Sequence, residues 1–112
     1  MQSQSLEFVQ IINRLKRGTL DGKVLWERTG SYGHQFAAPL DNGHRALVAS
    51  APSGTAVLFT MTNAQGVQTL YLDSSRLQDD VVRLALLQLF VAVRDTLAHH
   101  VTNEALRAVK DL

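Results

Sequence analysis

The sequence predicts an α+β domain, with an N-terminal helix, an antiparallel meander of about five strands, a long C-terminal helix and a short final helix. Three observations support this prediction. Apolar residues recur at helical spacing near the start, short β-branched and aromatic runs separated by turn signals fill residues 23–73, and a leucine-rich helical pattern follows residue 76. Because helices and strands are segregated along the chain, we expect the helices to pack on one face of the sheet.

The composition fits a single domain over residues 1–112 and excludes several kinds of site. With 46% hydrophobic and 19% charged residues, the chain lies outside the range of disordered sequences. Cysteine is absent, which excludes disulfides, thiolate zinc sites and thiol nucleophiles. The N-terminus lacks the pattern of a signal peptide, and the longest uncharged run, residues 84–93, is about half a membrane span. We therefore expect a cytoplasmic protein without a membrane contact.

The first helix is expected to begin at Ser5, a candidate N-cap, and to end at Gly18. Its basic residues gather near the end: Arg14, Lys16 and Arg17. Cations there oppose the partial negative charge of the helix terminus, which is a structural explanation for the cluster. The alternative is that the basic end of this helix, together with Arg28, binds nucleic acid.

The strand region is divided by three turn signals. The strongest is the Asp-Asn-Gly run at residues 41–43, since asparagine and glycine tolerate the positive φ of a tight hairpin. It is expected to join a strand through Phe36 and Ala38 to a strand over residues 45–50. Further turns are expected at residues 52–54 and 64–66, with strands over 55–63 and 67–72.

Residues 22–29, which read Gly-Lys-Val-Leu-Trp-Glu-Arg-Thr, follow the first helix, and an Asn-Ala-Gln-Gly turn at residues 63–66 precedes another apolar strand. This order resembles small bacterial proteins of unknown function in which a helix precedes a Gly-x-Leu-x-Trp-like first strand. The resemblance covers nearly the whole chain. It implies a helix, a β-meander and a helix, and it carries over no catalytic residue.

The C-terminal region is expected to form two helices. Asp73, Ser74 and Ser75 are candidate caps for a long helix over residues 76–100, and Thr102 is a candidate cap for a short final one. One apolar stripe of the long helix must cover the sheet. It comprises Val82, Ala85, Leu86, Leu89, Phe90, Val93 and Leu97.

A second apolar stripe of the long helix, Leu84, Leu87 and Val91, lies among charged residues on the opposite face. A helix that covers one small core has no use for it within the chain unless the N-terminal helix packs there. Three outcomes remain open: burial against a second copy, burial under the N-terminal helix, and binding of a different protein. We assign Leu84, Leu87 and Val91 as the candidate interface.

The remaining candidates for chemistry are weak. Metal sites need three or four converging ligands, and the histidines lack that spacing, although His34 and His44 could face each other across the hairpin. Asp95 and His99 are four residues apart on one helix face, a spacing typical of a helix-end ion pair. Trp26 is expected to be buried on the helix-covered face. We therefore assign no catalytic, cofactor or metal-binding residue.

The leading interpretation is a protein-interaction module, without enzyme activity, that forms a homodimer or binds a partner protein. The alternative from another class is a small-molecule-binding protein or weakly marked enzyme with a pocket between sheet and helix around Trp26.

Overall fold

The computed structural model describes residues 2–29, 35–50 and 56–112, with only the backbone of residues 2–4. It has helix α1 (Gln2–Leu20), strand β1 (Glu27–Arg28), strand β2 (Gln35–Pro39), a 3-10 turn (Asp41–Gly43), strand β3 (Arg45–Ser50), strand β4 (Val57–Thr62), strand β5 (Gln68–Asp73) and helix α2 (Asp80–Val109). The predicted α+β class, with a five-stranded antiparallel meander between an N-terminal and a long C-terminal helix, is confirmed.

The sheet follows chain order, β1-β2-β3-β4-β5, and every neighbouring pair is antiparallel. Its register aligns buried residues across four strands. Phe36 lies opposite Val48, and Phe59 pairs with Val48 on one side and with Leu72 on the other. All four side chains are buried, so this row marks the face of the sheet that the core covers.

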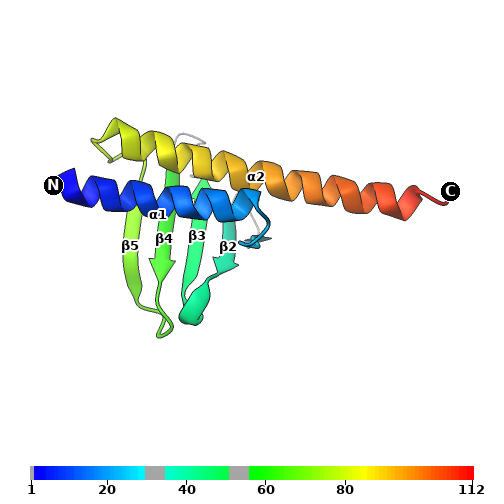
Figure 1. Cartoon of the computed structure of the whole chain (residues 1–112), viewed down its shortest axis with the longest axis horizontal. Coiled ribbons are helices and arrows are strands. Elements are labelled where there is room, and N and C mark those ends of the chain that lie inside the picture. The colour runs from blue at the N-terminus through cyan, green and yellow to red at the C-terminus, as the bar shows by residue number, and fades with distance from the viewer. Residues whose placement is uncertain (1, 30–34, 51–55) are drawn as a thin grey trace.

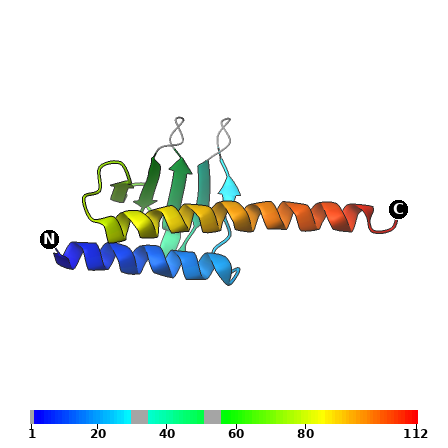
Figure 2. The same cartoon turned by 90° about the horizontal axis from the view of Figure 1, so that it is seen from above.

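Both helices cover that face, as Figures 1 and 2 show. They lie side by side, run in the same direction and cross the strands. Ile12 and Leu15 of α1 and Leu86 and Leu89 of α2 are buried in one cluster with the sheet residues. In the described part of the chain, no helix is long and apolar enough to cross a membrane.

The limits of α1 differ from the prediction at both ends. Ser5 lies inside the helix, where its hydroxyl hydrogen-bonds the Asp79 carboxylate, so it is not an N-cap. Gly18 does not end the helix. Its carbonyl accepts hydrogen bonds from the amides of Lys23 and Val24, and the chain reverses around Gly22 at a φ of 76°. A side chain at Gly18 would clash with Val24, so glycine there permits the close return of the chain.

The predicted hairpin geometry is confirmed at the first turn, where Asn42 and Gly43 have φ values of 60° and 76°. At the turn after β4, the Asn63 side-chain oxygen accepts hydrogen bonds from the amides of Gln65 and Val67, and Gly66 has a φ of 79°. The turn expected at residues 52–54 lies outside the described residues.

The predicted short final helix is wrong, because α2 continues without a break to Val109. No glycine or proline occurs after residue 80 to interrupt it. Thr102 does not cap a new helix, since its hydroxyl donates back to the Ala98 carbonyl one turn earlier. His100 Nε2 lies 3.6 Å from Glu104 Oε1, again one turn along the same helix.

The start of α2 also differs from the prediction. Its N-cap is Asp79, whose carboxylate accepts hydrogen bonds from the amides of Val81 and Val82 at 2.9 and 3.4 Å. The expected cap Ser74 is buried instead at the end of β5. Its hydroxyl and amide exchange hydrogen bonds with the backbone of Val57, which ties β5 to the start of β4.

Candidate interaction surface

The predicted interface residues lie together on the side of α2 that faces away from the core. Leu84, Leu87 and Val91 are spaced by three and four residues, and their exposed fractions are 57%, 38% and 42%. On the opposite side of the same segment, Leu86, Leu89 and Val93 are fully buried. This segment of α2 therefore has two apolar sides, of which the fold uses one.

Helix α1 packs beside α2 without covering the exposed stripe. Lys16 Nζ donates to Gln88 Oε1 at 3.4 Å, so the two helices meet along one edge of the stripe. A shallow groove of about 440 Å³ lies there, and its walls include Lys16, Leu87 and Val91. The exposure of the stripe overturns the possibility that α1 buries it within the chain.

Polar contacts fix the first turn of α2 relative to its neighbours. The Ser5 hydroxyl, followed by the amides of Val81 and Val82, lowers the pKa of Asp79 below its ordinary value. Arg83 pairs with Asp80 and donates to the backbone carbonyls of Ser74 and Leu77. These bonds join the start of α2 to α1 and to the end of β5, so the stripe lies on a firmly positioned helix.

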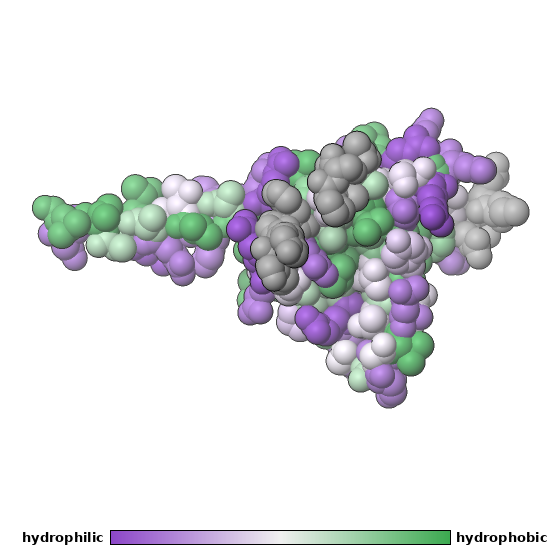
Figure 3. Space-filling view, turned by 180° about the vertical axis from the view of Figure 1, so that it is seen from behind, coloured by the Kyte–Doolittle hydropathy of each residue, from purple (hydrophilic) through white to green (hydrophobic). Residues whose placement is uncertain are grey.

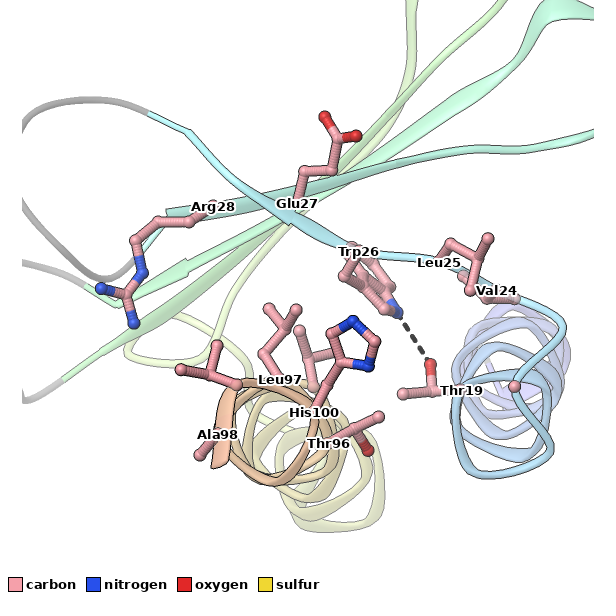
Figure 4. Close-up of a pocket in the computed structure, with 13 residues that line it drawn as sticks. Thr19, Val24, Leu25, Trp26, Glu27, Arg28, Thr96, Leu97, Ala98 and His100 are labelled. Carbon is pink, nitrogen blue, oxygen red and sulfur yellow. Dashed lines mark hydrogen bonds between the residues drawn. The ribbon is translucent and has the colours of Figure 1, made fainter. Parts of the chain in front are cut away.

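Trp26 is buried, with an exposed fraction of 6%, as predicted. Its indole Nε1 donates to the hydroxyl of Thr19 on α1 at 2.8 Å, and that hydroxyl donates to the Leu15 carbonyl at 2.7 Å (Figure 4). The hydrogen-bonding capacity of the indole is thus used inside the fold. Burial and this bond give Trp26 a structural role.

A second groove, of about 1030 Å³, opens beside Trp26 where α2 passes the β1 edge of the sheet. Leu25 and Leu97 supply apolar parts of its wall, and Glu27, Arg28 and His100 supply polar ones. The Arg28 guanidinium also lies 5.9 Å from the centroid of the Phe36 ring. An apolar molecule with a polar end would match this mixture of side chains.

The other sequence candidates form no site among the residues that are described. No group of three histidine, aspartate or glutamate side chains there could hold a metal ion. His44 has its Nδ1 3.2 Å from the Asp41 carbonyl, while His34 lies outside the described ranges. Asp95 pairs with Arg94, at 3.3 Å from Oδ1 to Nε. The capping explanation holds for Arg17 alone, because α1 continues to Leu20 and places Arg14 and Lys16 before its last turn.

The prediction missed the apolar surface beyond the sheet. Past residue 98, α2 projects beyond the β1 edge, as Figures 1 and 2 show, and Val101, Leu106 and Val109 there are 62%, 60% and 54% exposed. In Figure 3, apolar residues gather along much of this projection, with hydrophilic residues along its lower edge. The absence of a helix breaker around Thr102 was the available signal.

The chain matches no protein-family model, no curated protein and no solved structure. The features that could bind a partner or ligand are the exposed stripe of α2, its apolar projection and the groove beside Trp26.

Proposed function

We propose that the protein is a protein-interaction module that forms a homodimer through the exposed stripe of α2, Leu84, Leu87 and Val91. The observation that supports this most is that α1 packs directly beside α2 and still leaves the stripe exposed. Contiguous exposed apolar residues with a polar rim are typical of binding surfaces. A twofold axis would bury identical stripes of two copies against each other.

The test is the mass in solution of Leu87→Asp, because a carboxylate in the middle of the stripe cannot be buried against a second copy without a partner. The unmodified protein is expected to be a dimer by size-exclusion chromatography with light scattering, and Leu87→Asp a folded monomer. Val67→Asp is the matched control, since Val67 is also exposed but lies after β4, away from α2. It should remain a dimer.

A heterologous protein partner is the remaining form of the same proposal. A monomeric parent would favour it over the homodimer, and a Leu87→Asp variant that unfolds would show that the stripe stabilises the monomer itself. The expected bacterial cytoplasmic location belongs to this proposal too, and fractionation of producing cells tests it.

Small-molecule binding is a second candidate, favoured by the apolar groove beside Trp26 with Arg28 and His100 in its wall. Trp26 is the only tryptophan, so its emission reports on this groove directly. An amphipathic anionic dye such as anilinonaphthalene sulfonate should quench that emission. Leu25→Asp, a change to an exposed part of the wall, should weaken the quenching while Val67→Asp should not.

A further inference from the structure

The exposed stripe continues as a seven-residue repeat into the projecting half of α2. One set of repeat positions holds Leu84, Val91, Ala98 and Ala105, and the set three residues later holds Leu87, Arg94, Val101 and Ala108. None of these side chains is buried. Apolar residues at both sets of a heptad form the seam along which two helices pair and wrap around each other. We name these eight positions the α2 seam.

The opposite side of the projecting half is polar. His100, Asn103, Arg107 and Lys110 follow one another at spacings of three and four residues. The apolar side that covers the core therefore ends where the sheet ends, while the α2 seam continues. A short helix that packs against nothing is only marginally stable in water. The apolar residues of the projection that belong to the α2 seam thus need a partner that follows it, whereas Leu106 lies off the seam.

The three stripe residues alone are too small an interface for a stable dimer. Full burial of a leucine or valine gains about 1.5–3 kcal/mol. These side chains are already half covered, so they supply on the order of 1 kcal/mol each. A micromolar dimer requires about 8 kcal/mol beyond the entropy lost on association. The α2 seam from Leu84 to Ala108 is about 36 Å long and supplies the missing contacts.

We infer that the occupant of the α2 seam is the same seam of a second copy, running antiparallel; this rests on the proposed homodimer. The sizes of the residues support that direction. Large side chains occupy the half over the sheet and mostly alanines occupy the projecting half. In an antiparallel pair centred near residue 96, Leu84 meets Ala108 of the second copy and Leu87 meets its Ala105. Leucines thus face alanines at both ends of the pair, while Val91 lies opposite Val101 nearer its centre.

The charges support the same direction. Arg94 is the one charged residue of the α2 seam, and Asp95 lies beside it. In a parallel pair Arg94 would face Arg94 of the second copy, and this places two like charges together in the contact. In the antiparallel pair Arg94 lies opposite Ala98 of the second copy, less than one turn from that copy's Asp95. At the centre of the pair, Arg94 of each copy then lies near Asp95 of the other, so the charges are complementary.

Cysteine cross-linking tests the direction, because the natural chain contains no cysteine. Leu87→Cys and Ala105→Cys are prepared separately, mixed under reducing conditions and then oxidised. If the pair is antiparallel, the oxidised mixture should contain a covalent dimer. Neither variant oxidised alone should form one. The matched control replaces Ala105→Cys by Leu106→Cys, one residue further along the same helix and away from the seam, and should give no covalent dimer.

The possible results separate this inference from the proposed function. Leu87→Cys that cross-links with itself indicates a parallel pair and overturns the inference, while the homodimer stands. A dimer in solution without any of these cross-links means that another surface pairs, and the inference fails. A parent that stays monomeric overturns this inference together with the proposed homodimer and leaves only a heterologous partner for the stripe. Circular dichroism of each variant confirms that the fold is retained, and equal cross-linking by Leu106→Cys would mean random collision and contradict the inference.

Discussion

The two halves of α2 have different surroundings although they form one unbroken helix. The half over the sheet buries Leu86, Leu89 and Val93 completely and is held at its start by the Asp79 cap. The half past Ala98 projects beyond the β1 edge with Val101 and Leu106 largely exposed. Only the first half contributes to the core of its own chain, so apolar residues in the second need another explanation.

The comparison shows how one helix can serve two purposes. Apolar residues occupy opposite sides of α2 over the sheet, whereas in the projection they lie mainly on one side, with Leu106 as the exception. The apolar side that both halves have in common is the exposed α2 seam. Under the proposed pairing, the shared exposed side, and not the core side, accounts for the length of α2.

The largest expected effect contrasts the two halves directly. Leu89→Ala removes a fully buried side chain and should lower the free energy of unfolding by about 2–5 kcal/mol. Leu106→Ala, in the projection and off the α2 seam, should change it by less than about 0.5 kcal/mol. Urea unfolding followed by circular dichroism measures both. Equal losses would show that the projection packs against its own chain.

A smaller effect is expected at the point where α1 meets β1. Thr19→Val keeps the shape of the side chain but leaves the indole N–H of Trp26 without its acceptor, which should cost about 1–3 kcal/mol. Thr19→Ser retains the hydroxyl and should lose clearly less stability. If Thr19→Val unfolds at the same urea concentration as the parent, the buried bond does not stabilise this junction.

The smallest effect concerns pH and the start of α2. The pKa of Asp79 is lowered in the folded protein by Ser5 and by the amides of Val81 and Val82. The stability from this carboxylate is therefore fully present above the unfolded value of 3.8 and is lost as the pH falls through the lower folded value.

Asp79→Asn keeps a capping side chain without the charge, so its unfolding midpoint should change less between neutral pH and pH near 3 than the midpoint of the parent. Asp73, whose pKa is also lowered, mainly by Ser75, maintains part of the acid dependence. Asp21→Asn, at an exposed position after α1, is the control and should follow the parent. An Asp79→Asn profile that coincides with the parent's would contradict the lowered pKa of Asp79.

Much of the fold could be predicted because periodicity and turn chemistry are local. The alternation through Val57 and Phe59 and the Asn42-Gly43 turn specify their elements without any distant contact. Helix ends could not be read in the same way. Asp73 and Ser74 are good caps in isolation, but the burial of Ser74 against Val57 decided that Asp79 caps α2 instead.

The candidate surface was partly predictable for a related reason. The excess of apolar residues at Leu84, Leu87 and Val91 is visible in the sequence because helical spacing places them opposite the core stripe. Their exposure depends on where α1 packs, which is a tertiary property. The continuation of the stripe was missed because Thr102 and Glu104 resemble the start of a new helix, while the hydroxyl of Thr102 bonds within the old one.

Sedimentation equilibrium of the unmodified chain over a wide range of concentrations tests the self-association of α2 most directly. We expect a mass of twice the 12.3 kDa of one chain at high concentration, falling toward 12.3 kDa on dilution. In the same experiment Leu87→Asp should remain at the mass of one chain. A parent that sediments as a single chain at every concentration would contradict the proposal that α2 pairs with itself.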